Sequence, residues 1–438
     1  MSRSILSIYK AAELSARLRE QIVRRESIQD TSVHDTVASI LAAVRDTGAQ
    51  AVLNFTRQFD GVEVTELLSS RSEFDQAEAA LPADLRAAFN AAAANIRAFH
   101  ELQRAGLKDA ELTLGGTRLG FRYQAVDCAA VYVPGGKARY PSSVLMGLIP
   151  ANVAGVRDCM LVTPPTANGS VDPAVLYCAR LAGCETVIKS GGAQGIAAAA
   201  FGLGGRRPDL VIGPGNRFVT EAKQQLAGQG LLRIDSPAGP SEVLVVADDS
   251  ANPEWVAADM LSQAEHGADS PAILACLDLE FAQAVNQALD RGLAERPARA
   301  EWKRTSIQEH SCAIVFESKQ EALDFANEYA AEHLEICTRD PEGDFQQIRH
   351  AGSVFLGHYA PVALGDYYSG TNHVLPTGGT ARFYAGLGVD SFLKRMSWQY
   401  ATRESLAASR KGIALMSAYE GFDQEHGHSV EVRFQDAT

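Results

Sequence analysis

Two residues that suit proton transfer stand side by side in this chain, Glu332 and His333. They fall where a helical pattern gives way to a short apolar run, Leu334-Glu-Ile336. Histidine is the usual general base near neutral pH, and a carboxylate can deprotonate or orient water. Adjacent acid and histidine residues also occur at solvated helix ends, so this segment alone fits either interpretation equally well.

Two further segments carry groups that bind divalent cations. Gln263 and His266 are three residues apart at the end of an expected helix, so their side chains share a face. Asp366 and His373 lie on an expected Gly- and Thr-rich loop over residues 365–380. A helix cap and an ordinary surface loop would explain the same residues without any metal.

The C-terminal end adds Glu420, Glu425, His426 and His428, which are either ligands or part of a polar tail. Together with a histidine from this end, Gln263, His266 and Asp366 make an oxygen and nitrogen donor set without a thiolate. Zinc accepts such donors, and harder ions such as manganese also fit them.

Composition excludes several classes of protein. The chain has 438 residues, 46% hydrophobic and 21% charged, which is typical of a globular protein with two or three domains. A net charge of −13 argues against nucleic acid or anionic lipid as the main partner. There is no membrane-length apolar run and no signal peptide pattern. Seven scattered cysteines without a CxxC pair indicate free thiols, so we expect a cytoplasmic protein.

The pattern of apolar runs predicts the elements that position these residues. The first 125 residues are expected to be mostly helical, with helices near 31–45 and 84–102. Short strands then alternate with helices over 128–230 and again over 242–356, which predicts parallel, doubly wound sheets. In such sheets ligands bind at the carboxyl ends of the strands. The tail after residue 382 is expected to hold a helix and a short strand at 430–434, and it is too small to fold alone.

Nucleotide-binding motifs are not evident in the sequence. It contains neither GxGxxG nor GxxxxGK[ST], and Gly213-Pro-Gly-Asn216 is only a partial echo of the former. A P-loop nucleotide site is therefore excluded, and a conventional dinucleotide fingerprint is absent.

Several longer stretches, taken together, resemble the histidinol dehydrogenase family in family order across nearly the whole chain. These stretches are Tyr132-Val-Pro-Gly-Gly136, Gly191-Gly-Ala-Gln194, Gly213-Pro-Gly-Asn216, Pro237-Ala-Gly-Pro-Ser241-Glu, Leu261-Ser-Gln-Ala-Glu-His-Gly267, Ala331-Glu-His-Leu334, Ala351-Gly-Ser-Val-Phe-Leu-Gly357, Gly365-Asp-Tyr and Leu375-Pro-Thr377.

The resemblance implies oxidation of L-histidinol through bound L-histidinaldehyde to L-histidine by two NAD-dependent hydride transfers, the last steps of histidine biosynthesis. It implies a homodimer with one Zn²⁺ per subunit, in which zinc holds the substrate's amino and imidazole nitrogens. His333 would take the alcohol proton, and Glu332 would deprotonate the water that attacks the aldehyde.

The same resemblance assigns the remaining roles. Metal ligands fall on Gln263, His266, Asp366 and His426. Substrate contacts fall on Ser241, His373 and Glu420, besides the metal ligands and His333. NAD contacts fall on Tyr132, Gln194 and Asn216.

The expected architecture is α/β, with two Rossmann-like doubly wound units in a domain-swapped dimer. We expect an N-terminal helical arm over 1–30 and a first α/β domain over 31–127 plus 238–378, which carries the catalytic and metal residues. An NAD-contacting domain spans 128–237, and a swapped tail spans 379–438. The swap would place Glu420 and His426 in the partner's site.

One spacing departs from the family pattern, in which the C-terminal Glu usually precedes the ligand His by five residues. Here Glu420 precedes His426 by six, and Glu425 and His428 are close competitors for the fourth ligand. A paralogous zinc- and NAD-dependent dehydrogenase of another small polar alcohol, such as a sulfonated diol, is therefore the main alternative. A metal-dependent scaffold or regulatory binding protein is the non-enzymatic one.

Overall fold

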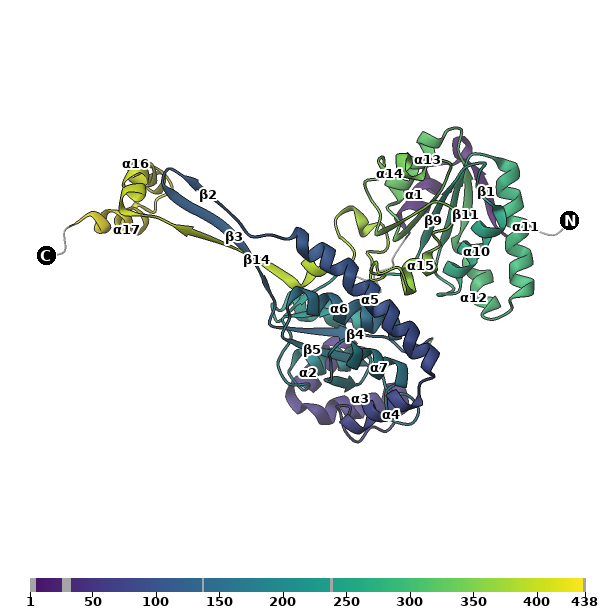
Figure 1. Ribbon diagram of the computed structural model, residues 1–438, viewed down its shortest axis with the longest axis horizontal. Coiled ribbons are helices and arrows are strands. Elements are labelled where there is room, and N and C mark those ends of the chain that lie inside the picture. The colour runs from purple at the N-terminus through teal and green to yellow at the C-terminus, as the bar shows by residue number, and fades with distance from the viewer. Residues whose placement is uncertain (1–4, 26–32, 136–137, 237–238, 436–438) are drawn as a thin grey trace.

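The computed structural model describes residues 5–25, 33–135, 138–236 and 239–435. Two parallel sheets with helices on both faces form separate α/β units, and an antiparallel ribbon carries a small helical tail away from them (Figure 1). The predicted α/β class with parallel sheets is confirmed. The expected domain boundaries between 30 and 31 and between 237 and 238 lie outside the described residues.

The larger sheet has six parallel strands in the order β1-β11-β10-β9-β12-β13. In that order the strands span Ser7–Lys10, Cys312–Val315, Ala272–Cys276, Val243–Ala247, His333–Cys337 and Ser353–Leu356. Helices α10 (Pro253–Ala264) and α11 (Leu279–Glu295) cover one face, while α1 (Ala16–Arg24) and α13 (Lys319–Tyr329) cover the other. Short helices α12 (Ala300–Thr305), α14 (Pro341–Phe345) and α15 (Val362–Tyr367) complete this unit.

The N-terminal arm differs from the expected helical segment because β1 is an edge strand. Residues 7–10 pair in parallel with β11, so that Ser7 lies opposite Cys312. A four-residue strand whose partner lies some three hundred residues away has no local sequence signal.

The smaller sheet has five parallel strands in the order β6-β5-β4-β7-β8. In that order the strands span Val187–Lys189, Asp158–Thr163, Cys128–Tyr132, Leu210–Ile212 and Arg233–Ile234. Helices α4 (Arg71–Ala80), α5 (Ala83–Gly106), α6 (Pro141–Ala154) and α7 (Pro173–Leu181) cover one face. Helices α2 (His34–Thr47), α3 (Ala49–Asp60), α8 (Gly192–Ala200) and α9 (Arg217–Gly228) cover the other.

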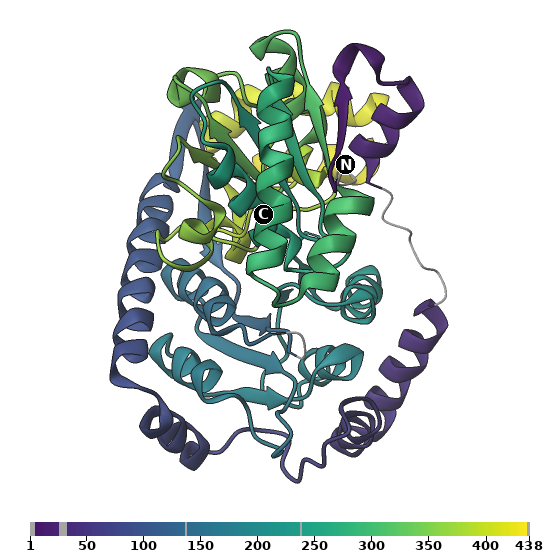
Figure 2. The same cartoon turned by 90° about the vertical axis from the view of Figure 1, so that its right-hand side faces the viewer.

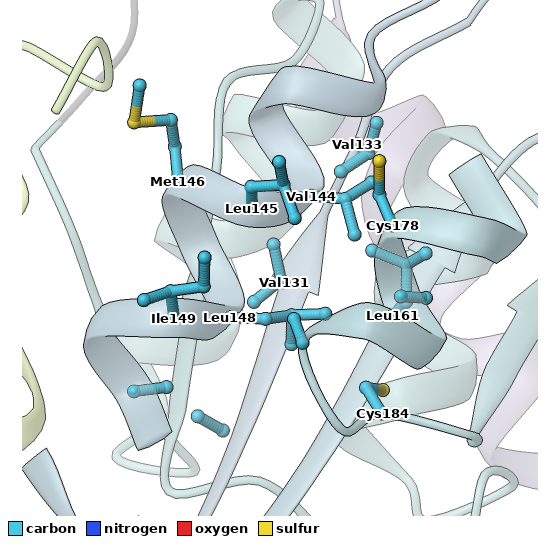
Figure 3. Packing of buried hydrophobic residues seen from close by; sticks show 14 of the residues in the cluster. Val131, Val133, Val144, Leu145, Met146, Leu148, Ile149, Leu161, Cys178 and Cys184 are labelled. Carbon is cyan, nitrogen blue, oxygen red and sulfur yellow. The ribbon is translucent and has the colours of Figure 1, made fainter. Parts of the chain in front are cut away.

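Helix α6 is apolar on all sides because it is enclosed. Its residues Val144–Ala151 are all buried, and a helix that is hydrophobic all round belongs in a core. Figure 3 shows Leu145 and Leu148 of this helix packed with Val131 of β4.

The helices of residues 34–106 pack on the five-stranded sheet, whereas the sequence grouped 31–127 with 238–378. Ile40 of α2 belongs to the core of one face of that sheet, and Ile96 of α5 belongs to the core of the other. The structure differs from the expected grouping here. The sequence of an amphipathic helix reveals an apolar face, but it does not reveal which sheet that face packs against.

The third sheet is the antiparallel ribbon, in the order β14-β3-β2. These strands span Leu393–Tyr400, Thr117–Ala125 and Ala110–Leu114, and the tail beyond holds α16 (Arg403–Tyr419) and α17 (His428–Glu431). The expected strand at 430–434 is wrong, because these residues continue α17 into a helical turn at Val432–Phe434. Five residues that alternate between apolar and polar fit both the period of a strand and the period of a helix when no partner strand is known.

The two α/β units meet through opposite sheet edges. The chain leaves the carboxyl end of β8 at Ile234 and enters the amino end of β9 at Val243. The segment 235–242 therefore joins the carboxyl edge of the five-stranded sheet to the amino edge of the six-stranded sheet. Figure 2 shows the two units one above the other.

The cysteines are free, as expected, and all except Cys159 are buried. Burial raises the pKa of Cys128 to about 11, which keeps this thiol protonated at neutral pH. No helix among the described residues is both long and apolar enough to cross a membrane.

The turn after β7 gives a stability prediction. Gly213 has φ +108°, and a Cβ there would collide with the carbonyl oxygen of Tyr132. Gly213→Ala should therefore lower the free energy of unfolding by about 1–3 kcal/mol, measured by urea denaturation. Gly228→Ala is the control: the exposed end of α9 has open space for a Cβ, so stability should rise by roughly 0.5 kcal/mol. Equal effects of the two substitutions would contradict the steric argument.

Candidate active site

Glu332 and His333 lie at the junction of α13 and β12 and are both buried. Ala330 ends α13 in the left-handed region at φ 51°, which turns the chain from helix into strand. His333 Nδ1 lies 3.5 Å from Glu332 Oε2. The side chains of Glu332 and His333, which are adjacent in the sequence, therefore also lie close together in the structure.

The Glu332 carboxylate receives two hydrogen bonds from the segment that precedes β9. Ser241 Oγ donates to Glu332 Oε2 at 2.6 Å, and the backbone N–H of Glu242 donates to the same oxygen at 2.8 Å. Burial raises the pKa of Glu332, and His333 with these two donors opposes that rise.

His333 has one ring nitrogen engaged and one available. Nδ1 lies 3.0 Å from the carbonyl oxygen of Glu242, and because a carbonyl only accepts, Nδ1 carries the proton. Nε2 is buried without a hydrogen-bond partner among the described residues and lies 3.6 Å from Asp366 Oδ1. Burial alone would lower the pKa of His333, but the charges of Glu332 and Asp366 raise it to about 9.

Asp366 lies in the last turn of α15, rather than in the expected loop. Burial would raise its pKa, but His333, with His373 and His266 nearby, holds the pKa below its usual value. His373 Nδ1 lies 2.9 Å from the Asp366 carbonyl oxygen, and Nε2 lies 3.0 Å from Ser143 Oγ at the start of α6. His373 therefore links the two α/β units, and burial lowers its pKa, which favours the neutral ring.

Gln263 and His266 lie where α10 returns to the amino edge of the six-stranded sheet. Gln263 is 1% exposed, and neither its amide nitrogen nor its oxygen has a hydrogen-bond partner among the described residues. His266 remains accessible to solvent. Partial burial lowers the pKa of His266, while the charge of Asp366 works in the opposite direction. His266 is therefore close enough to Asp366, His333 and His373 for their charges to act on its ring.

Tyr132, Gln194 and Asn216 lie at the carboxyl edge of the five-stranded sheet. The backbone N–H of Gly192 donates to the Tyr132 hydroxyl at 3.2 Å, and Gln194 is buried in the first turn of α8. Asn216 is exposed and caps α9 by accepting from the N–H of Phe218 at 3.0 Å.

Glu420 and His426 are not brought to this group within one chain. Both are exposed on the tail, and Figure 1 shows that the tail lies at the tip of the ribbon, far from β9 and α15. Within the described part of the chain, no three His, Cys, Asp or Glu side chains are grouped so as to hold a metal ion.

Sequence analysis assigned no role to Glu242 and Ser143, which contact site residues, or to Arg25, which contacts Glu242. Arg25 Nε lies 2.7 Å from Glu242 Oε2, and both side chains are at least nine-tenths buried. The available signal was an acidic residue, Glu242, directly before an all-apolar strand, since a buried carboxylate needs a partner. Nothing local pointed to Arg25 as that partner.

A buried carboxylate–imidazole pair at the edge of a parallel α/β sheet is suited to proton transfer in an enzyme. The histidinol dehydrogenase family model matches residues 23–434. A histidinol dehydrogenase of Leptospira interrogans is 44% identical over 429 residues, which cover 98% of this chain and 99% of that protein. One from Leptospira biflexa is 47% identical over 404 residues, which cover 92% and 93%.

A solved structure agrees with these relatives. The crystal structure of histidinol dehydrogenase from Elizabethkingia anophelis superposes with a TM-score of 0.93 at 36% identity, and the match covers 99% of each chain. The chain belongs to the histidinol dehydrogenase family.

The unpartnered amide of Gln263 gives a prediction for the protein stripped of metal with a chelator. A buried polar group without a partner costs about 1–3 kcal/mol, so Gln263→Leu should raise the free energy of unfolding by about that amount. Asn327→Leu is the control, because its buried amide donates to Leu323 O and Gln347 O and accepts from the N–H of Arg349. That variant should be less stable. Denaturant unfolding measures both, and a destabilised Gln263→Leu protein would contradict the argument.

Proposed function

We propose that this protein is a zinc-dependent histidinol dehydrogenase that oxidises L-histidinol through L-histidinaldehyde to L-histidine with two molecules of NAD. Family membership over residues 23–434 carries the proposal. The buried pair of Glu332 and His333 supports it, because the two oxidations need one group to accept the alcohol proton and another to activate water.

The chemistry of the donor set fits a divalent cation. Gln263 offers a buried amide oxygen that has no hydrogen-bond partner in the described part of the chain. Asp366 offers a carboxylate held in its charged form, and His266 offers an accessible ring. These three would be the ligands from one subunit. Bound zinc would supply a Lewis acid that holds the amino alcohol by its nitrogen atoms.

His333 would accept the alcohol proton at Nε2, since Nδ1 is committed to the Glu242 carbonyl. The raised pKa of His333 depends on two carboxylates, Glu332 and Asp366. When Asp366 is engaged by a cation, one of these charges is offset, and the ring is then able to act as a base near neutral pH.

Glu332 would deprotonate the water that attacks the aldehyde. Hydrogen bonds from Ser241 and the Glu242 N–H fix its carboxylate, so the carboxylate would keep the same position in both half-reactions. Ser241 and His373 would also contact the substrate. A buried site keeps the reactive aldehyde away from bulk water.

The carboxyl edge of the five-stranded sheet would hold NAD, with Tyr132, Gln194 and Asn216 as contacts. The bond between Ser143, at the start of α6, and His373 links the two units and supports a cofactor site close to the acid–base pair. NAD held by these residues would supply the hydride acceptor for both oxidations.

A homodimer would complete the site with the tail of the partner subunit. His426 would be the fourth metal ligand and Glu420 a substrate contact in the partner's site. The tail exposes a cluster of large apolar side chains, Leu415, Met416, Tyr419, Phe422 and Val432. Such a patch is typical of a subunit interface, and its exposure in one chain supports association with a second copy.

A paralogous dehydrogenase of another small polar alcohol is the alternative, favoured only by the six-residue spacing between Glu420 and His426. The following experiment separates the two.

Zinc-loaded protein should produce about two NADH per L-histidinol consumed, because alcohol and aldehyde oxidation each release one hydride. In Glu332→Gln the first oxidation should persist while aldehyde conversion slows by roughly 100-fold, so that the yield falls toward one. The control Glu328→Gln changes the half-exposed partner of Arg19 and should leave both steps intact. A stable aldehyde from the unmodified protein, or faster oxidation of a different alcohol in a panel, would refute the proposal.

Subunit mixing tests the shared site. Asp366→Asn and His426→Ala should each be inactive alone. After co-refolding of equal amounts, about a quarter of wild-type activity should return, because half the dimers are mixed and each of these has one intact site. If each site were built from one chain, mixing would restore nothing.

A further inference from the structure

Glu242 touches the acid–base pair with its backbone and with its side chain. Its N–H donates to Glu332 Oε2 at 2.8 Å, and its Oε1 accepts from the Glu332 N–H at 3.2 Å. Its carbonyl oxygen accepts from the His333 N–H at 3.3 Å and lies 3.0 Å from His333 Nδ1. The orientation of both residues therefore depends on where Glu242 sits.

Arg25 is the cation that faces the Glu242 carboxylate. Arg25 Nε lies 2.7 Å from Glu242 Oε2, and the two side chains are 9% and 2% exposed. The guanidinium carbon lies 3.7 Å from the centre of the Tyr329 ring, and Nη1 donates to the Tyr329 carbonyl at 2.9 Å. Burial raises the pKa of Glu242 to about 7, and the charge of Arg25 works against that rise.

The backbone at Arg25 indicates that its side chain is what this position requires. Arg25 ends α1 at φ 42° and ψ 69°, in the left-handed region. Glycine or asparagine is usual at such a helix end, because other side chains are strained there. The buried contacts of the Arg25 side chain with Glu242 and Tyr329 stabilise the residue in this conformation.

We propose that Arg25 is a positioning residue for Glu332 and His333, acting through the charge of Glu242. The proposal rests on the proposed roles of those two residues and assigns the N-terminal arm a part in the reaction. Without Arg25, Glu242 holds a buried carboxylate that has lost its cation. Such a group either takes up a proton or moves toward water, and either change disturbs its bonds to Glu332 and His333.

Four proteins test this, each measured with zinc, NAD and L-histidinol beside the wild type. Arg25→Met removes the charge and keeps the stem, and Arg25→Met combined with Glu242→Gln removes both charges while keeping an amide oxygen as acceptor. Arg25→Lys keeps a cation in a different shape. Arg19→Met is the matched control, because Arg19 also links α1 to α13 but pairs with Glu328, at 2.5 Å, instead of Glu242.

We expect Arg25→Met to lower kcat by about 100-fold, as a misplaced catalytic pair does, with KM values within about twofold of wild type. The double variant should recover to within about threefold of wild type, and Arg25→Lys should lie between. Arg19→Met should match wild type. Unchanged kcat in Arg25→Met would overturn the proposal. A double variant that folds but remains about 100-fold slower than wild type would also overturn it, even if Arg25→Met itself does not fold.

Amide hydrogen exchange gives a readout that needs no substrate. The N–H groups of Glu332 and His333 donate to Glu242, so their exchange should be faster in Arg25→Met and return to the wild-type rate in the double variant. If wild type fails to oxidise L-histidinol while this exchange pattern holds, the proposed function fails and the positioning by Arg25 stands. Unchanged exchange in Arg25→Met would refute the positioning, whatever the activity.

Discussion

The burial of the Glu332 carboxylate beside His333 is the constraint that shapes this part of the molecule. Removing an ion from water costs several kcal/mol unless charges and hydrogen bonds in the protein replace the solvent. Here Ser241, the backbone of Glu242 and the ring of His333 replace it. These groups come from two segments some ninety residues apart. They meet only because β9 and β12 are parallel neighbours with Val243 opposite His333.

In the proposed site, only one of the two sheets would bind its ligand at the carboxyl edge, where open α/β sheets usually do. Tyr132, Gln194 and Asn216 lie at such an edge, whereas Glu332, His333 and Ser241 lie at the amino edge of the six-stranded sheet. A site between two opposed edges draws on loops and helix ends from both units. The bonds from His373 to Ser143 and from Asn372 to the Met146 carbonyl hold those units together across it.

The sequence predicted what is encoded locally. Apolar runs such as 128–132 and 243–246 marked the core strands of both sheets. Residue types pointed to Glu332, His333 and Asp366, three residues that the fold then brings together. The contact of Arg25 with Glu242 was out of reach, because neither residue carries a local signal for the other. The ribbon was missed for a related reason. The alternation of Met396, Trp398 and Tyr400 covers only the second half of β14, and its partner β3 lies far away in the sequence.

The tail depends on a ribbon that is stiff. Strands β14 and β3 pair over eight residues, and Trp398 lies against Gly120, where any Cβ would strike the indole. A flexible linker would have to be ordered each time His426 met a partner subunit, and that ordering would weaken association. A paired ribbon is already ordered in the single chain, so most of that entropy is lost during folding. In the proposed dimer, the antiparallel sheet would hold two exposed residues, Glu420 and His426, at a fixed distance from the body of the subunit.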